Sequence, residues 1–324
     1  MPKTPTLDDV AKRYQVSMTP LVRSLAKSSP AVARQFVPDT REMIDDDDDA
    51  LDPIGDRAHS PVPGIVHRYP DRALLMPLSI CPVYCRFCFR RETVGQQDAG
   101  LLSEDELDAA FDYLTNTPSI WEVILSGGDP LALSPRRLQS LLQRLRRIPH
   151  IRVLRIHTRV PLLAPERINE KLTTALRDAK PVFVVLHTNH ADEFTDAGRA
   201  ACARLVDTGT PLLSQSVLLK GVNDAVEHLE ALMRVCVENR IKPYYLHHSD
   251  KAPGTSHLRT TLQHGRELVE ALRGPVSGLC QPHYVLDIPG GHGKVPMNPD
   301  HAELLDGDHW WVRDTHGHRH RYRG

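Results

Sequence analysis

Two hydrophobic patterns alternate along the chain from about residue 73 onward. Short apolar runs rich in β-branched residues predict buried strands over 74–80, 121–126, 151–157, 181–187, 211–218, 241–246 and 283–287. Between them, apolar residues recur every three or four positions after a Ser, Thr, Asp or Pro, which predicts helices over 103–115, 134–147, 165–179, 194–208, 224–239 and 258–273. Such regular alternation is typical of an α/β fold whose parallel sheet is closed, or partly closed, into a barrel.

The two ends of the chain do not follow this alternation, so the sequence predicts three parts, 1–72, 73–295 and 296–324. The first part is predicted to be helical and irregular, and we interpret its acidic run at 45–49 as a solvated loop. The last part is predicted to be a short extension that ends in a hairpin over 301–323, because its turn formers and apolar residues no longer continue the strand–helix rhythm.

The composition indicates a globular protein of the reducing cytoplasm. The 324 residues are 40% hydrophobic and 25% charged with a formal net charge of −1, which argues against a broad surface for nucleic acid or anionic lipid. No apolar run approaches the ~20 residues needed to span a bilayer. Three of the six cysteines belong to one motif, which does not suit a secreted disulfide framework. The others, Cys202, Cys236 and Cys280, lie in apolar surroundings and are predicted to be structural.

The most informative motif is a cysteine triplet, Cys81, Cys85 and Cys88, in the pattern C-x3-C-x2-C. A structural zinc site uses four ligands, usually as two separated pairs, and a four-thiolate iron–sulfur cluster needs a fourth cysteine. Three ligands without a fourth favour a cluster with one open iron, where chemistry takes place. For this motif alone, an incomplete zinc site or three buried small side chains are the alternatives.

Polar residues follow the predicted strands at their carboxyl ends, where parallel α/β barrels collect their functional groups. The cysteine triplet follows the first strand, and the glycines after the second allow a backbone to approach a ligand closely. We expect one site lined by these residues, which are Ser126, Gly127, Gly128, Asp129, His157, Arg159, His187, His190, Gln215, Asp250 and Asp287.

A second motif, at 287–294 (DIPGGHGK), ends in Lys294. A nucleotide P-loop needs G-x4-G-K-[ST], and this segment fails that pattern because position 288 is Ile and position 295 is Val. A lysine on a flexible glycine-rich loop instead suits covalent binding of pyridoxal 5′-phosphate (PLP). A surface loop with a solvated lysine is the alternative for this segment alone.

Taken together, these motifs resemble the lysine 2,3-aminomutase family of the radical S-adenosylmethionine (SAM) superfamily. The triplet with Phe87 in its aromatic position resembles the superfamily signature. Residues 67–72 (HRYPDR), 85–91 (CRFCFRR) and 214–224 (SQSVLLKGVND) are similar to further family segments. The resemblance covers residues 60–315 and implies a partial (βα)6 TIM-like radical SAM barrel.

The resemblance implies three cofactors and a role for each matching residue. A [4Fe–4S] cluster is expected on Cys81, Cys85 and Cys88, SAM on the open iron of that cluster, and PLP on Lys294. The residues expected around PLP are Arg68, Tyr69 and Arg72, and those around SAM are Ser126, Gly127, Gly128, Asp129, His187 and Gln215. The residues expected to bind the substrate are Arg90 at its carboxylate and Asp250 and Asp287 at its distant ammonium.

The reaction implied is the interconversion of L-lysine and β-lysine by a radical 1,2-amino shift, with electrons from a flavodoxin- or ferredoxin-type donor. Two close carboxylates raise each other's pKa unless a cation lies between them, which suits lysine and argues against glutamate. Within the family, the alternatives are an enzyme acting on arginine and one supplying β-lysine for modification of translation elongation factor P. A non-catalytic iron–sulfur or zinc protein is the alternative from another class, and the sequence leaves open whether the chain forms a homo-oligomer.

Overall fold

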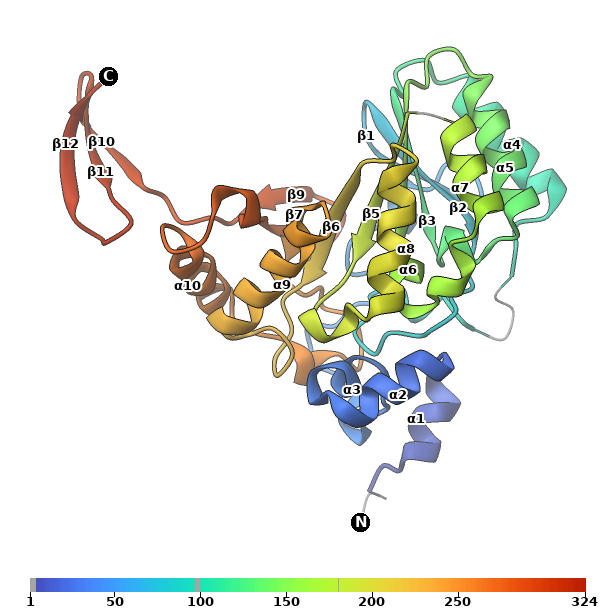
Figure 1. Ribbon diagram of the computed structural model, residues 1–324, viewed down its shortest axis with the longest axis horizontal. Coiled ribbons are helices and arrows are strands. Elements are labelled where there is room, and N and C mark those ends of the chain that lie inside the picture. Colours follow the sequence, from blue (N-terminus) through green and yellow to red (C-terminus); the bar gives the residue numbers. More distant parts are fainter. Residues whose placement is uncertain (1–3, 97–99, 180) are drawn as a thin grey trace.

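A nine-stranded sheet forms the centre of the computed structural model, which describes residues 4–96, 100–179 and 181–324 (Figure 1). The strands lie side by side in chain order, and the seven inner ones are parallel while the two edge strands run antiparallel to their neighbours. They are β1 (Ile65–Tyr69), β2 (Arg72–Leu78), β3 (Glu122–Gly127), β4 (Val153–Thr158), β5 (Val182–His187), β6 (Leu212–Val217), β7 (Ile241–His247), β8 (His283–Ile288) and β9 (Gly293–Pro296). Because β9 does not pair with β1, the barrel is partly closed, which confirms the predicted fold class.

Six principal helices connect the parallel strands. They are α4 (Glu104–Thr115), α5 (Pro135–Arg146), α7 (Glu170–Asp178), α8 (Asp196–Asp207), α9 (Val226–Glu238) and α10 (Leu262–Leu272), and the short α6 (Val160–Leu163) follows β4. In α5 the Ser134 hydroxyl accepts the Arg137 N–H, Pro135 occupies the first turn, and the four leucines of one face are buried. The predicted strands and helices are thus confirmed to within a few residues. In the part of the chain that the structure describes, no helix is long and apolar enough to cross a membrane.

The N-terminal segment packs against the barrel as three short helices, α1 (Leu7–Arg13), α2 (Pro20–Ser28) and α3 (Pro30–Phe36) (Figure 1). Val22, Val32 and Phe36 are fully buried and belong to the main hydrophobic core. The boundary expected at residue 72 falls at the turn between β1 and β2, which pair as an antiparallel hairpin. The segment before the barrel is therefore tied to it both by apolar packing and by a strand.

The acidic run at 45–49 is more than the solvated loop predicted from the sequence. The side chain of Asp49 is only 3% exposed and pairs with Arg259, while Asp46 and Asp48 pair with Arg259 and Lys251. The Ala50 N–H also donates to the carbonyl of Lys251, 2.9 Å away. Residues 45–48 are exposed, as expected of a solvated loop, but the prediction missed the ion pairs, because their cations lie about two hundred residues further along the chain, in the loop between β7 and α10.

The C-terminal residues form a separate antiparallel sheet of β10 (Ala302–Asp306), β11 (His309–Arg313) and β12 (Arg319–Arg323), which stands away from the barrel (Figure 1). The predicted hairpin is formed by β11 and β12, and β10 adds a third strand that the sequence did not predict. Cys202, Cys236 and Cys280, predicted to be structural, are buried in the main hydrophobic core.

Candidate active site

The cysteine segment follows β2 and forms a turn that carries all three thiols. The Cys88 N–H donates to the Cys85 carbonyl at 3.1 Å, and all three cysteines are free and partly buried. Burial and the charge of Cys85 raise the pKa of Cys88 to about 11. Burial, Asp129 and the other two cysteines raise the pKa of Cys81. The charge of another cysteine of the triplet therefore contributes to the raised pKa of both Cys81 and Cys88.

The N-terminal segment holds the backbone of this turn in place. The Tyr84 N–H donates to the Ser17 carbonyl at 3.1 Å, and the Arg86 N–H donates to the Gln35 carbonyl at 2.8 Å. Both acceptors lie on the segment that the sequence treats as a lead-in. The conformation of the cysteine turn therefore depends on residues that precede their partners by 67 and 51 positions.

A buried ion triad makes a second connection between the same parts. Glu42 is fully buried and accepts hydrogen bonds from the guanidinium groups of Arg86 and Arg91, which are themselves buried. Burial alone would raise the pKa of Glu42, but the two arginines hold it below its ordinary value. Arg91 also donates to the Gly254 carbonyl, 3.1 Å away, which ties in the loop after β7.

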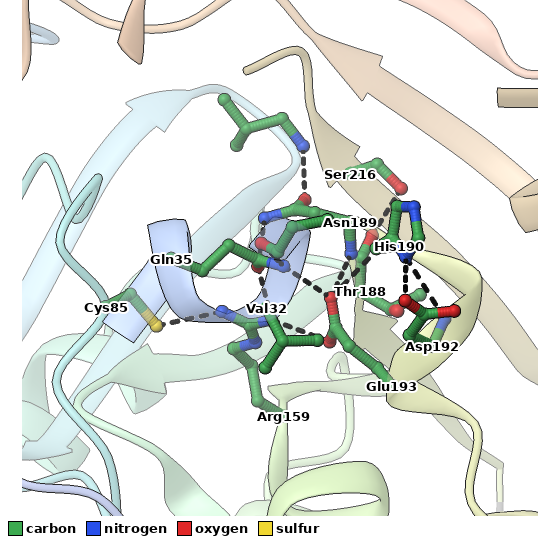
Figure 2. A network of polar contacts seen from close by, with 12 residues as sticks. Val32, Gln35, Cys85, Arg159, Thr188, Asn189, His190, Asp192, Glu193 and Ser216 are labelled. Atoms are coloured by element: carbon green, nitrogen blue, oxygen red, sulfur yellow. Dashed lines mark hydrogen bonds and ion pairs between the residues drawn. The ribbon is translucent and has the colours of Figure 1, made fainter. Parts of the chain in front are cut away.

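Arg159, at the end of β4, contacts the cysteine turn directly. Its Nη1 donates to Cys85 Sγ at 3.0 Å, and its Nη2 donates to Gln35 and Glu193 at 3.0 and 2.7 Å (Figure 2). Burial would lower the pKa of Arg159, but the charges of Cys85 and Glu193 more than offset this and raise it. A permanent cation therefore faces one of the three sulfur atoms.

The chemistry of this donor set fits an iron–sulfur cluster. Thiolates are the ligands such clusters use, and a small cavity of about 40 Å³ beside Cys81 and Cys85 is lined also by Asp129 and Arg159. Within the described ranges, no three His, Cys, Asp or Glu side chains stand together as a site for a metal ion. The match to a cluster therefore depends on the kind and spacing of the donors.

The glycines after β3 pack against the cysteine segment. The Gly128 N–H donates to Leu78 O at 2.8 Å, the Asp129 N–H donates to Ile80 O at 3.0 Å, and a Cβ on Gly128 would lie 2.3 Å from the Ile80 carbonyl. The close approach expected toward a ligand is thus, in this structure, an approach to the chain just before Cys81. Because Gly128 has no side chain, the end of β3 can pack closely against the start of the cysteine turn.

The carboxylate of Asp129 already accepts hydrogen bonds from neighbouring groups of the protein. It is buried and accepts hydrogen bonds from the Thr158 hydroxyl at 2.7 Å and from the backbone N–H groups of Leu131 and Arg159 at 3.0 and 2.8 Å. Burial raises its pKa in spite of these donors. Its carboxylate joins the ends of β3 and β4, next to Cys81.

Lys294 lies in β9 directly opposite Asp287 of β8, so it belongs to a strand and not to the glycine loop as predicted. Its ammonium forms an ion pair with Asp287 and lies 3.2 Å from His247 Nδ1. Its backbone N–H donates to the Tyr69 hydroxyl at 2.8 Å. The amine also lies 5.4 Å from the centre of the Tyr245 ring, so its neighbours come from β7, β8 and β1.

The glycines before Lys294 face the N-terminal segment. Gly290 N–H donates to Pro53 O at 3.3 Å, and a Cβ on Gly55 would lie 2.6 Å from the backbone N of Gly291. Gly290, Gly291 and Gly293 all have positive φ, which only glycine adopts at little cost. His292 interrupts the run between Gly291 and Gly293.

The two carboxylates Asp250 and Asp287 lie close together but in different electrostatic states. Burial and the nearby charge of Asp287 raise the pKa of Asp250 to about 7. Burial would raise the pKa of Asp287 as well, but the hydrogen bond from His247 and the charge of Lys294 hold it below its ordinary value. One carboxylate is therefore neutralised by Lys294, while the other has no full counter-charge.

Asp56 links two arginines that the sequence places in the site. It accepts from Arg90 Nε at 2.8 Å and from Arg68 at 3.2 Å, and all three side chains are largely buried. Arg72 stacks on the Tyr69 ring, with its guanidinium carbon 3.8 Å from the ring centre. The structure thus gathers Arg68, Arg90 and their neighbours at the side of the barrel where Asp250 lies.

Buried histidines connect the two halves of the site. Burial and the positive charges of Arg155, His247, Arg90 and Lys294 lower the pKa of His157. Burial and then Arg159, His247 and His157 lower that of His187, whose ring lies 5.5 Å from that of Phe87 in the cysteine turn.

His157 and His187 each have a ring nitrogen that is available for a hydrogen bond to a ligand. In the part of the chain that the structure describes, neither Nε2 of His157 nor that of His187 has a hydrogen-bond partner. Gln215 lies in β6 beside His187 of β5. His187 therefore contacts the cysteine turn through Phe87, whereas Lys294 contacts His247 at the end of β7.

Three residues that build this site were not found from the sequence. Glu42, Asp56 and Glu193 are single carboxylates, and their arginine partners lie between 12 and 49 positions away. No local pattern marks them. Arg159 was noted only as a strand-end residue, and nothing in the sequence joins it to Cys85.

Comparison with known proteins adds to this geometry. A model of the radical SAM superfamily matches residues 75–235. The chain is 41% identical over 309 residues to the L-lysine 2,3-aminomutase of Acetoanaerobium sticklandii and 40% identical over 309 residues to that of Clostridium subterminale. These alignments cover 93% and 94% of this chain and 74% of each relative. It is also 35% identical over 278 residues to the glutamate 2,3-aminomutase of Clostridioides difficile, covering 86% of this chain and 66% of that protein.

Among solved structures, SuiB of Streptococcus suis bound to its precursor peptide SuiA aligns with a TM-score of 0.52 and 16% identity, over 68% of this chain and 49% of that one. The same protein bound to SAM aligns with a TM-score of 0.51. At this level of identity the likeness concerns the fold, and it agrees with the partly closed barrel seen here.

Proposed function

Because the chain belongs to the lysine 2,3-aminomutase family and is therefore a radical SAM aminomutase, we propose that it interconverts L-lysine and β-lysine. The observation that carries the choice of substrate is the pair Asp250 and Asp287 beside Lys294. Arg90 and Lys294 are assigned the other two contacts of the substrate, to its carboxylate and, through PLP, to its amino group.

The [4Fe–4S] cluster and SAM of the superfamily supply a radical that removes hydrogen, and PLP carries the amino group that migrates. We assign the cluster to Cys81, Cys85 and Cys88. We assign PLP to Lys294, whose amine lies among His247, Asp287 and Tyr245 and whose side chain is 21% exposed. An enclosed position protects a reactive radical from water and from other C–H bonds.

The substrate's distant ammonium is assigned to Asp250 and Asp287. In the ligand-free protein, Lys294 itself is the cation on Asp287. When Lys294 is engaged by the cofactor it no longer provides that charge, and the two carboxylates then form an acidic site for an incoming ammonium. Glutamate would bring a third negative charge to the same place, which disfavours it even though one relative acts on glutamate by name.

The substrate's carboxylate is assigned to Arg90. Its guanidinium pairs with Asp56 through two nitrogens, which is the planar arrangement that a substrate carboxylate also requires. Arg68 shares the same Asp56 partner. Binding of an anion at either arginine must therefore replace or rearrange its contact with Asp56.

The phosphate of PLP is assigned to Arg68, Tyr69 and Arg72, which lie on the β1–β2 hairpin next to Lys294. The residues assigned to SAM are Ser126, Gly127, Gly128, Asp129, His187 and Gln215. The unpartnered Nε2 of His187 supports its role, whereas the Asp129 carboxylate is already used by the β3–β4 junction. An electron donor of the flavodoxin or ferredoxin type completes the proposal.

Anaerobic turnover tests the proposal. The reconstituted protein is given SAM, PLP, dithionite and, separately, lysine, arginine or glutamate, and the products are identified by mass and chirality. We expect β-lysine from lysine alone, and loss of this activity in Asp250→Asn with unchanged iron content. Asp314→Asn, an exposed carboxylate of the C-terminal sheet paired with His320, is the control and should retain full turnover. A fully loaded protein that converts only arginine or glutamate would refute the assignment of lysine.

Covalent PLP is tested separately. Borohydride treatment followed by peptide mass mapping should place PLP on Lys294. The label should disappear in Lys294→Ala and persist in Lys220→Ala, since Lys220 is exposed. A label on another lysine in the unaltered protein would contradict the assignment.

A further inference from the structure

Arg159 is the permanent cation that the structure places against a cysteine of the triplet. Its Nη1 donates to Cys85 Sγ at 3.0 Å, and the guanidinium group also lies near the rings of Phe36 and Phe87. The side chain is only 8% exposed. Little water therefore competes for this contact, which strengthens its electrostatic effect.

A rigid frame fixes the position of the guanidinium group. Glu193 Oε2 accepts from Arg159 Nη2, while Glu193 Oε1 accepts from Gln35 Nε2 and from the backbone N–H groups of Asn189 and His190, at 2.9 to 3.1 Å (Figure 2). The Asn189 amide also donates to Gln35 Oε1 at 3.0 Å. Gln35 comes from α3, so the N-terminal segment helps to aim Arg159 at the sulfur atom.

The contact is one-sided. Among the residues that the structure describes, Cys85 alone of the three receives a side-chain N–H, from Arg159. Reduction of an iron–sulfur cluster adds one electron, and so one negative charge, without forming or breaking a bond. Hydrogen bonds to the ligand sulfurs and nearby positive charge stabilise that reduced state and raise the reduction potential.

We propose that Arg159, held by Gln35 and Glu193, is a positioning residue that raises the reduction potential of the cluster through the hydrogen bond that its N–H group donates to Cys85 Sγ. The inference rests on the radical SAM part of the proposed function and not on the choice of substrate. It gives the α3 segment a part in the electron transfer that begins turnover. The electron comes from the external donor, and Arg159 exchanges no proton.

Two variants test this without leaving a buried charge alone. Arg159→Lys keeps a cation that can pair with Glu193, but a lysine has no second nitrogen to donate a hydrogen bond to Cys85. The double variant Arg159→Met with Glu193→Gln removes both charges together, so that neither is left unpaired in the core. Arg155→Lys is the control, because Arg155 forms a similar two-nitrogen pair with Glu122, at 2.9 and 2.6 Å, away from the cysteines.

The measurement is the midpoint potential of the reconstituted cluster, followed by the EPR signal of the reduced state during redox titration without substrate. At the potential where half of the unaltered protein is reduced, we expect the ratio of reduced to oxidised cluster to fall roughly tenfold in both test variants, equal to about 59 mV for one electron. Arg155→Lys should keep the original ratio.

An unchanged midpoint potential in variants that carry four irons per chain would overturn the inference while leaving the proposed function intact. Loss of the cluster from a folded variant would also overturn it, because Arg159 would then hold the cluster and not tune it. If the unaltered protein itself bound no four-iron cluster, the proposed function would fail instead.

Discussion

Replacement of Glu42 by Gln is expected to be the most destabilising near-isosteric change in this protein. The variant keeps the size of the side chain and its hydrogen-bonding oxygen but removes its charge. Glu42 is fully buried, and the guanidinium groups of Arg86 and Arg91 that surround it are 2% and 5% exposed. Removal of the carboxylate therefore leaves two buried cations without their shared counter-charge.

The size of the effect follows from this geometry. Removing one partner of a buried ion pair costs about 3–5 kcal/mol, because the remaining charge is left in a medium that solvates it poorly. Here two cations share one anion, so we expect the upper part of that range. Glu42 also accepts the Asp39 N–H at 3.0 Å, a contact that Gln can keep. The loss of stability should therefore come from the missing negative charge, because the cap of the 3-10 helix at Thr40–Met43 is kept.

Urea unfolding of the cluster-free protein, under anaerobic reducing conditions near pH 7, measures the free energy of unfolding. Fluorescence and circular dichroism should give the same transition before a two-state free energy is assigned. The control is Glu230→Gln, which removes an exposed pair with Arg234 on α9 and should change stability by less than about 1 kcal/mol. If Glu42→Gln were as stable as Glu230→Gln, the triad would not contribute as argued. Because the triad also supports the cysteine turn, the iron bound per chain should fall in Glu42→Gln alone.

Two further predictions concern the interior of the site. The folded-state pKa of Asp250, about 7, exceeds its unfolded value near 3.8, so the folded protein binds more protons between these pH values and its stability falls as pH rises through that window. In Asp250→Asn, the free energy of unfolding should therefore fall less steeply with pH, by up to about 1.4 kcal/mol per pH unit. Urea unfolding of both proteins between pH 4 and 8 measures this difference, and parallel profiles would contradict the stated pKa. Gly128→Ala should cost about 1–3 kcal/mol and lower the iron content, because the new Cβ would meet the Ile80 carbonyl beside the cysteine turn. Gly278→Ala is its control, since no described atom lies within 4 Å of the added carbon; equal stability and equal iron in the two would show that the contact near Ile80 is unimportant.

Much of the fold was predictable because its signals are local. The leucines of α5 repeat at helical spacing, Ser134 and Pro135 mark its start, and the β-branched runs mark the buried strands. These patterns report only that a residue faces a core or begins a helix. They carried less information at the ends of the chain, where a third strand and the pairing of Asp49 with Arg259 were missed.

The candidate site divides in the same way. The spacing of Cys81, Cys85 and Cys88 and the segment ending in Lys294 could be found from the sequence, because each lies within one short stretch. Their joint placement was inferred from the rule that parallel strands gather their carboxyl ends. The hydrogen bond of Arg159 to Cys85 spans 74 residues, and no motif joins those two positions.

The sequence by itself determined the alternation of strands and helices, the helix starts and the identity of the three thiols and the lysine, since each depends on neighbouring residues and on backbone preferences. Only the tertiary structure decided which charges meet: Glu42 with Arg86 and Arg91, and Arg159 with Cys85. The physical reason is that apolar periodicity fixes the face that a segment buries but leaves its polar side chains many partners of opposite charge. Packing of the N-terminal helices against the strand ends reduces these to one, and burial then makes that choice costly to change.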